Sequence, residues 1–255
     1  MWTFYERVFH SHWIQIWTIA LAMLPIRLFG LTAIEMAYPA HSVPYRQVLP
    51  RHIFNSILYL ILVLPIADYL DRWTKYLPET PDAVQAAPLA LRLFVYTLIS
   101  DFLAYWVHRL LHTGTLWPAH KWHHYPVNLY WCSGVQASII QQALSNLPYI
   151  FAGFFLGVIP SWLILSIILK NAIENDLMHL NVRWGYRWME WVIVTPRYHQ
   201  IHHSDNPKHY QCNLGVLFSI WDRIFGTYFD PQAAPPSIQF GIGEKVSPIR
   251  LVIGV

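Results

Sequence analysis

Histidine is the residue type whose number and spacing in this sequence point most directly to chemistry. The stretch from Asp101 to His124 carries two groups, one with histidines four residues apart and one with histidines at i, i+3 and i+4. The second spacing returns in HQIHH near residue 200, and His179 follows Asn175 by four residues. Residues three and four apart lie on the same face of a helix, so each group presents its imidazoles together. The nine histidines concerned are His108, His112, His120, His123, His124, His179, His199, His202 and His203.

This pattern predicts a dinuclear metal centre. Imidazole is the commonest metal ligand in proteins, and nine donors exceed the roughly four positions of one tetrahedral zinc site. Imidazoles suit iron, zinc, copper and nickel alike. The sequence has neither the HExxH motif of zinc proteases nor the Glu-x-x-His pairs of soluble di-iron bundles. What remains favours an all-histidine site around two irons that is open to dioxygen, with zinc as an ion that can substitute in purified material.

The other polar residues receive more modest interpretations. Asp101 precedes His108 by seven residues, about 20° from its direction at 3.6 residues per turn. This predicts that its carboxylate holds an imidazole N–H, as metal-bound histidines require. Asn175 lies one helical turn before His179 and is expected to meet the metals with it, whereas Asp176 and Glu190 read as exposed charged caps. Structural roles are expected for the histidines outside the ligand groups, which are His10, His12, His41, His52 and His209.

Composition indicates a membrane protein. Hydrophobic residues make up 55% of the 255 residues and charged residues only 12%, against about 25% charged in a typical soluble domain. The net charge of +3 is too small and too scattered to indicate a nucleic-acid partner. The two cysteines, Cys132 and Cys212, lack metal-type spacing and are expected to be reduced thiols. No basic leader with a small-residue cleavage site precedes the first apolar run, which is therefore expected to stay as a membrane helix.

The apolar runs predict an all-α, multi-pass membrane helical bundle. Runs at residues 13–31, 53–70 and 88–107 approach the roughly 20 residues that cross the hydrocarbon, giving three crossings. A fourth run at residues 134–171, broken by proline and glycine, predicts a helical hairpin that returns to the side it left. The expected organisation is N-terminal membrane helices and loops at 1–87, a catalytic unit at 88–230 and a Pro/Gly-rich tail without helical period at 231–255.

Charge asymmetry predicts the orientation. The segment 27–51 carries three arginines against Glu35 alone, whereas the segment 68–82 carries four acidic residues against one arginine and one lysine. An excess of Lys and Arg marks the cytoplasmic side of a membrane, so the first loop is expected inside and the second outside. The third crossing then delivers His108 and His112 to the cytoplasmic face, where the metal site is expected.

Five motifs in one order resemble the sterol desaturase/fatty acid hydroxylase superfamily. They are DFLAYWVHRLLH, HKWHH, NDLMHLN, TPRYHQIHHS and WDRIFGTY, between Asp101 and Tyr228. Members of this superfamily are membrane-bound non-haem di-iron oxygenases. The resemblance implies that the nine histidines coordinate two irons, that dioxygen is a co-substrate, and that a membrane lipid such as a sterol or fatty acyl chain is hydroxylated or desaturated. Asn175 stands where members place histidine or asparagine, which implies a weaker or water-mediated ligand.

Two departures from the family pattern concern the substrate and the surroundings of the metals. After HKWHHY the chain continues as PVNLYWCSGVQASIIQQ, without the Arg-x-His-Pro motif of many members. After the last histidine group, residues 211–215 read QCNLG in place of Asp-x-Asn-aromatic-Gly. The chain has no haem-binding segment and no flavin motif, so an external electron donor of ferredoxin or cytochrome b5 type is expected.

Two other classes of protein compete with an oxygenase. A histidine-rich metal-binding or metal-transport membrane protein would need ligands along a path through all the helices, but the first two apolar runs offer only His52 and Asp68. A metal-dependent membrane hydrolase would need a general base, and none is evident beside the histidines. The oxygenase is therefore the favoured interpretation.

The predicted topology can be tested with terminal tags in intact cells and in inside-out vesicles. A tag before Met1 is expected to react with a membrane-impermeant label from outside, and a tag after Val255 only from the cytoplasm, because three crossings precede a hairpin that returns. Cytoplasmic labelling of both ends would contradict the count of crossings.

Overall fold

The computed structural model describes residues 22–50, 53–54, 57, 79–157, 159, 161–235 and 237–255. Within these ranges the fold is helical, with isolated β-bridges and no β-strand, which confirms the all-α prediction for this part of the chain. The longer elements are η1 (Ile26–Leu31, a π-helix), α2 (Thr32–Ala37), α5 (Leu89–Leu111), α6 (Trp117–His124), α7 (Ile139–Leu156), α8 (Ser161–Met178), α9 (Pro196–His202) and α11 (Pro248–Ile253). The shorter ones are α4 (Asp82–Ala86), α10 (Ile220–Ile224) and the 3₁₀ turns η2 (Trp131–Val135), η3 (Met189–Trp191), η4 (Pro207–His209) and η5 (Pro231–Ala233).

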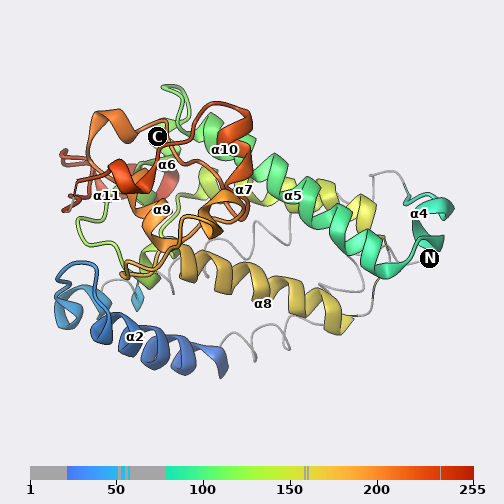
Figure 1. The fold of residues 1–255 in the computed structure, drawn as a ribbon, viewed down its shortest axis with the longest axis horizontal. Helices are drawn as coiled ribbons and strands as arrows, with labels where there is room; N and C mark the ends of the chain where they lie inside the picture. The colour runs from blue at the N-terminus through green and yellow to red at the C-terminus, as the bar shows by residue number, and fades with distance from the viewer. Residues whose placement is uncertain are drawn as a thin grey trace.

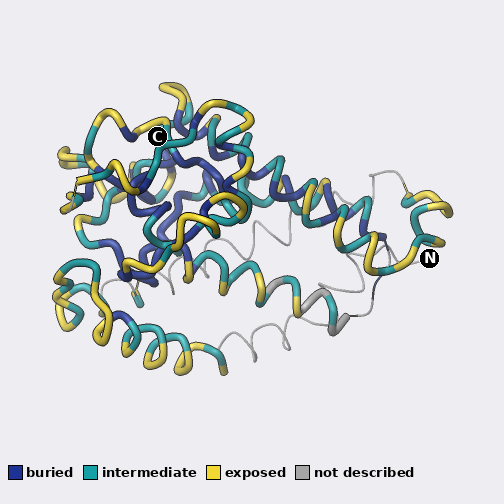
Figure 2. Tube along the Cα trace, in the orientation of Figure 1, coloured by how far each residue is buried: buried dark blue, intermediate teal, exposed yellow. Residues whose placement is uncertain are grey.

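The elements form a head and a set of long helices that extend from it. In Figure 1, α5, α7 and α8 run toward one end of the molecule, and the short helices α6, α9, α10 and α11 gather at the other. Figure 2 shows that the buried backbone is concentrated in this head, while exposed and partly buried residues alternate along the long helices. The head is therefore the most densely packed part of the described structure, and the long helices extend from it.

Two of the long helices are apolar enough and long enough to cross a membrane. They are α5 with 23 residues and α7 with 18 residues, which span about 34 Å and 27 Å at 1.5 Å per residue. Only 28% of each apolar window is buried inside the protein. Most of the residues in these windows are therefore partly or fully exposed on the surface of the protein, as in helices that contact lipid.

The structure describes some of the predicted membrane segments and not others. The third run, predicted over residues 88–107, is α5, and the hairpin consists of α7 and α8. Helix α7 continues through Pro148 and ends at Gly157, whose φ of 66° lies in the left-handed region. The second run, residues 53–70, and most of the first lie outside the described residues, so the structure describes neither of the first two crossings.

Buried carboxylates and apolar packing join the helices to one another, and one carboxylate joins α2 to the head. Arg27 in η1 forms a bidentate ion pair with Asp176 in α8. Its Nε donates to Oδ2 at 2.5 Å and its Nη2 donates to Oδ1 at 2.7 Å. Glu35 in α2 is fully buried and accepts hydrogen bonds from the backbone N–H groups of Trp131 and Asn181, both at 2.7 Å. The apolar cluster that joins α5 and α7 and extends toward α8 consists of Tyr96, Ala152, Leu156 and Ile159.

The interpretation of two acidic residues as exposed caps is wrong. Asp176 and Glu190 are buried ion-pair partners rather than exposed caps, because Arg27 and Arg197 reach them from other segments. The tail at 231–255, whose sequence has no helical period, contains the short helix α11, which contacts α6 and α7. A helix of six residues is too short to leave a clear period in the sequence, and its packing against α6 stabilises it.

Candidate metal centre

Four helices bring the predicted ligands together in the head. The last turn of α5 carries His108, and its C-cap is His112. Helix α6 carries three histidines within eight residues, and His179 follows the last residue of α8. Helix α9 begins with Thr195 as N-cap, whose hydroxyl accepts a hydrogen bond from the backbone N–H of Tyr198. This cap starts the helix one turn before its own three histidines.

The nine histidines lie in two groups, and within each group the ligand nitrogens lie within 4.8 Å of one another. All nine are buried. The five-histidine group consists of His108, His112, His120, His124 and His202. The four-histidine group consists of His123, His179, His199 and His203.

The two groups cut across the sequence motifs and adjoin each other. Helix α6 gives His120 and His124 to the five-histidine group and His123 to the four-histidine group. Helix α9 likewise contributes to both. The rings of His124 and His203, which belong to different groups, stack with their centroids 4.3 Å apart. The arrangement could hold two neighbouring metal ions, with helices α6 and α9 contributing histidines to both positions.

Backbone carbonyls define the tautomer of four of the imidazoles. A carbonyl oxygen can only accept a hydrogen bond, so an imidazole nitrogen bonded to it carries the proton, and the other ring nitrogen presents a lone pair. The pairs are His108 Nδ1 with Leu214 O at 2.8 Å, His123 Nδ1 with Gln136 O at 3.1 Å, His179 Nδ1 with Asn175 O at 2.6 Å, and His202 Nδ1 with Cys212 O at 3.1 Å. Each of these histidines therefore presents Nε2 as a metal donor.

The spacing of these nitrogens fits bound cations. The Nε2 atoms of His123 and His179 both carry lone pairs and lie 3.3 Å apart. Two lone pairs at this distance repel each other unless a cation lies between them. Donors about 2.1 Å from one ion and at right angles lie about 3.0 Å apart. In the five-histidine group, the buried Nε2 atoms of His112 and His202 have no hydrogen-bond partner, as expected of atoms that bind a metal.

Burial also keeps the imidazoles in their metal-binding form. Desolvation, followed by repulsion from neighbouring imidazoles, lowers the pKa of the α6 and α9 histidines well below the ordinary value of 6.5. The rings are therefore neutral at pH 7, and a neutral imidazole is the form that coordinates a metal.

Asp101 does not bond to an imidazole, contrary to the prediction from helical phase. Its carboxylate accepts hydrogen bonds from the backbone N–H of Leu217 at 2.7 Å, the backbone N–H of Phe218 at 3.0 Å and the indole N–H of Trp221 at 2.8 Å. The phase argument fails because the chain after α9 occupies this face of α5. Asp101 therefore bonds to the segment that follows α9 and not to one of the nine histidines.

The backbone carbonyl of Asn175 bonds to His179, as described above. The side chain of Asn175 lies close to Gly134. A Cβ atom on Gly134 in η2 would lie 2.5 Å from Asn175 Nδ2 and 2.5 Å from His179 Nδ1. Glycine is therefore required at this position for η2 to lie against α8. The sequence motifs missed both Gly134 and the carbonyls, because neither a backbone group nor a single glycine has a ligand signature.

The remaining histidines have other partners. His41 Nε2 lies 2.8 Å from the carbonyl oxygen of Leu129, and His209 Nδ1 lies 2.9 Å from the hydroxyl of Ser204. Among the described residues, neither belongs to a group of side chains that could hold a metal ion. These contacts fit the predicted structural roles, whereas His10, His12 and His52 lie outside the described residues.

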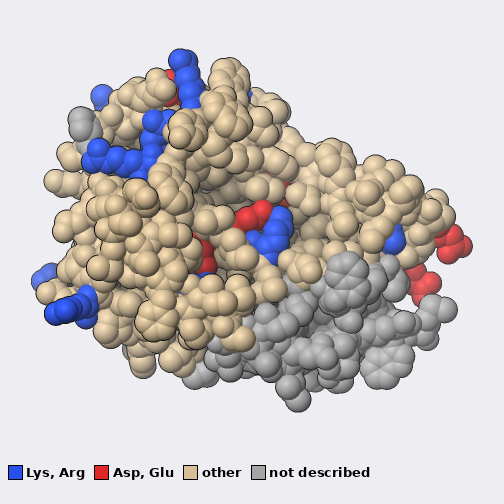
Figure 3. All heavy atoms as spheres, turned by 60° about the horizontal axis from the view of Figure 1, so that its bottom comes forward, with Lys and Arg blue, Asp and Glu red and all other residues tan. Residues whose placement is uncertain are grey.

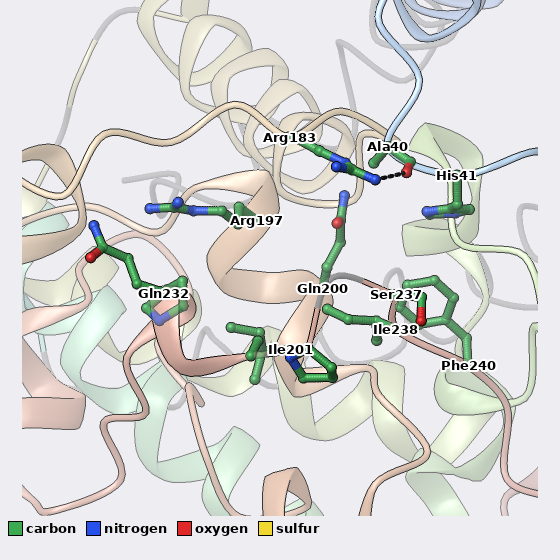
Figure 4. Close-up of a pocket in the computed structure, with 13 residues that line it drawn as sticks. Ala40, His41, Arg183, Arg197, Gln200, Ile201, Gln232, Ser237, Ile238 and Phe240 are labelled. Carbon is green, nitrogen blue, oxygen red and sulfur yellow. Dashed lines mark hydrogen bonds between the residues drawn. The ribbon is translucent and has the colours of Figure 1, made fainter.

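A pocket of about 440 Å³ lies beside α9 and is distinct from the histidine groups. Figure 4 shows Gln200 and Ile201 extending from α9 toward it, with Arg183 donating a hydrogen bond to the carbonyl oxygen of Ala40. Gln200 Nε2 donates to the carbonyl oxygens of Leu180 and Val182, both at 3.0 Å. These hydrogen bonds hold the loops around α9. None of the nine clustered histidines lines the pocket.

Ligand and bystander histidines can be separated by metal analysis. His202→Ala and His199→Ala are each expected to lose one of two bound metals, because each removes a donor from a different group. His209→Ala is the matched control and is expected to retain both metals, since its ring bonds to Ser204. Metal per chain is measured on membrane-extracted protein reconstituted with ferrous iron. Loss of metal from His209→Ala with full binding by His202→Ala would contradict the assignment.

Comparison with known proteins agrees with this arrangement. The family model described as fatty acid hydroxylase matches residues 93–227. Alkylglycerol monooxygenase of Xenopus tropicalis is 30% identical over 129 residues, covering 50% of this chain and 28% of that protein. Ornithine lipid hydroxylase OlsE of Rhizobium tropici is 29% identical over 166 residues, covering 63% of this chain and 48% of that protein. The putative Delta(7)-sterol-C5(6)-desaturase 2 of Arabidopsis thaliana is 26% identical over 218 residues, covering 79% and 72%.

The matched region therefore spans less than half the length of the first two relatives. No solved structure matches the chain. The family match covers every one of the nine histidines and more than half of the chain. The chain belongs to the fatty acid hydroxylase family.

Proposed function

We propose that this chain is a membrane oxidoreductase that uses two irons and dioxygen to hydroxylate or desaturate a membrane lipid. The observation that carries the proposal is the pair of adjoining groups of buried histidines, whose Nε2 lone pairs converge. The names of its relatives, a monooxygenase, a lipid hydroxylase and a sterol desaturase, support a lipid substrate. Residues 88–230 would form the catalytic unit, and α11 would support it by packing on α6.

The protein's own residues would hold the metals and exclude water. The two irons would supply dioxygen activation and abstraction of hydrogen from an unactivated C–H bond. His108, His123, His179 and His202 are held by carbonyls through Nδ1, so their Nε2 atoms point inward without rearrangement. Burial of all nine imidazoles keeps solvent from the donors. An external donor of ferredoxin or cytochrome b5 type would supply the electrons.

The placement of charge and apolar surface supports a membrane site that faces the cytoplasm. The metal groups lie where α5 enters the head, so a lipid in the bilayer around α5 and α7 would reach the site from the membrane side. Figure 3 shows most of the visible Lys and Arg side chains on the head, acidic side chains beside a basic one at the opposite tip, and both signs of charge between them. By the positive-inside rule, the head would lie in the cytoplasm.

The alternatives receive less support from the geometry. A metal transporter would need ligands along the long helices, whereas the described metal-type groups both lie in the head. A hydrolase would need a general base at the metals, and among the described residues the two groups contain histidine alone. An oxygenase needs neither feature.

The activity can be tested by comparing lipids from cells with and without the protein. Products with a mass increase of about 16 for hydroxylation, or a decrease of about 2 for desaturation, are expected, with dioxygen consumed in proportion when ferrous iron and a reductant are supplied. His123→Ala is expected to abolish the products while the protein still inserts in the membrane. Binding of one zinc without dioxygen uptake would contradict an oxygenase.

We further propose that Asn175 is a weak or water-mediated ligand beside the four-histidine group. An amide is a poorer donor than an imidazole, so it would leave a coordination position open to dioxygen. Asn175→His is expected to keep both metals but to lower turnover, because the stronger donor would fill that position. Asn175→Ala should also alter turnover, and wild-type turnover in both variants with unchanged iron content would contradict this role.

A further inference from the structure

The chain between α9 and α10 supplies two of the carbonyls that hold imidazoles. We name residues 211–218 the carbonyl loop. Its carbonyl oxygen at Cys212 bonds to His202, and its carbonyl oxygen at Leu214 bonds to His108. Both histidines belong to the five-histidine group. The carbonyl loop therefore contacts one of the two metal groups selectively through imidazole N–H groups.

A left-handed residue lies between these two carbonyls. Asn213 has a φ of 56°, the one positive φ of a non-glycine residue in the described part of the chain, and asparagine tolerates this region better than most residues. Its amide donates to the carbonyl oxygen of Tyr198 at 3.2 Å, and its side-chain oxygen accepts from the backbone N–H of Phe229 at 2.9 Å. These bonds hold the turn in which the two carbonyls are presented.

Asp222 in α10 binds the same turn from the other side. This carboxylate is fully buried. Its Oδ1 accepts from Leu214 N at 2.7 Å and Thr227 Oγ1 at 2.6 Å, and its Oδ2 accepts from Gly215 N at 2.8 Å and Tyr198 Oη at 2.9 Å. Both oxygens must therefore be acceptors, which a carboxylate provides and a carboxamide does not.

The close approach of Asp222 depends on a glycine. A Cβ atom on Gly215 would lie 2.9 Å from Asp222 Oδ2 and 2.7 Å from the carbonyl oxygen of Phe218. At the far end of the loop, Asp101 accepts from the backbone N–H groups of Leu217 and Phe218. The carbonyl loop is thus held between two buried carboxylates, one on α10 and one on α5.

The four-histidine group is oriented by different elements. His123 bonds to the carbonyl oxygen of Gln136, which follows η2, and His179 bonds to that of Asn175 in α8. Neither carbonyl belongs to the carbonyl loop or contacts Asp222 through a described hydrogen bond. The imidazoles of the two groups are therefore held by carbonyls of different segments, although Tyr198, which donates to Asp222, lies beside His199 on the shared helix α9.

We propose that Asp222 is a positioning residue for the five-histidine group: through the carbonyl loop it sets the orientation and tautomer of His108 and His202. This inference rests on the proposed metal centre but not on the reaction performed there. Loss of the Asp222 acceptors should weaken the metal at the five-histidine group and spare the other. Partners of metal-bound histidines typically contribute about 10–100-fold to metal affinity.

The test is metal binding by the full-length, detergent-extracted protein, titrated with ferrous iron in competition with a chelator under nitrogen. Asp222→Asn replaces one acceptor oxygen with a donor at nearly constant volume. It is expected to bind one of two irons about 10–100-fold more weakly and the other as wild type does. Asp230→Asn is the matched control, because Asp230 only accepts from Gln232 N near the surface, and it should bind both irons normally.

A double-mutant cycle identifies which metal is affected. Combined with His202→Ala, Asp222→Asn should cause no further loss, since both act on the five-histidine group. Combined with His199→Ala, it should leave no tightly bound iron. Gly134→Ala, which crowds His179, is expected to give the reverse pattern. Binding of both irons by Asp222→Asn at wild-type affinity, or equal weakening of both in protein with a native near-UV circular dichroism spectrum, would overturn the proposal.

A milder variant keeps the test decisive if Asp222→Asn fails to fold. Tyr198→Phe removes one of the four donors to Asp222 and should weaken the same iron to a smaller extent. Equal weakening of both irons in Tyr198→Phe would also overturn the proposal. Failure to oxidise lipid would count against the proposed function alone, because the selective loss of one metal can be measured with ferrous iron, or with cobalt, in the absence of turnover.

Discussion

The structure of the head depends on holding several neutral imidazoles with their lone pairs directed at one another. In the absence of a cation this arrangement is repulsive, because nitrogens such as His123 Nε2 and His179 Nε2 approach to 3.3 Å. In four of the nine imidazoles, those of His108, His123, His179 and His202, the opposite ring nitrogen is anchored by a backbone carbonyl. Backbone carbonyls serve this purpose well because they cannot donate, and so they leave one tautomer possible.

This requirement explains why so many buried carboxylates lie away from the metals. Glu35, Asp101 and Asp222 each receive several hydrogen bonds, largely from backbone N–H groups. Asp176 instead pairs with Arg27. A buried charge is tolerated when its acceptors are saturated. None of these carboxylates belongs to the two histidine groups; each holds a segment or a helix that packs around them.

A long helix fixes the position of the histidine groups relative to the apolar surface. Helix α5 is at once an outward-facing apolar span and the carrier of His108, so the metal groups lie where the span meets the head. Asp101, about two turns earlier, joins the same helix to the carbonyl loop by accepting a hydrogen bond from the backbone N–H of Leu217. The position of the site relative to the apolar surface is thus fixed by one continuous helix rather than by a flexible connection.

The sequence by itself determined which residues are brought together. Spacings of three and four residues act within one helix, so the ligand set could be predicted from local geometry, and α5 and the α7–α8 hairpin could be predicted from apolar runs. Only the tertiary structure decided how neighbouring histidines on α6 divide between two groups, and that Asp101 bonds to Leu217 rather than to an imidazole. It also decided that carbonyls at Cys212 and Leu214 select the tautomers. These outcomes depend on contacts between segments about 10 to 120 residues apart, where every residue offers the same backbone groups and side-chain type carries no information.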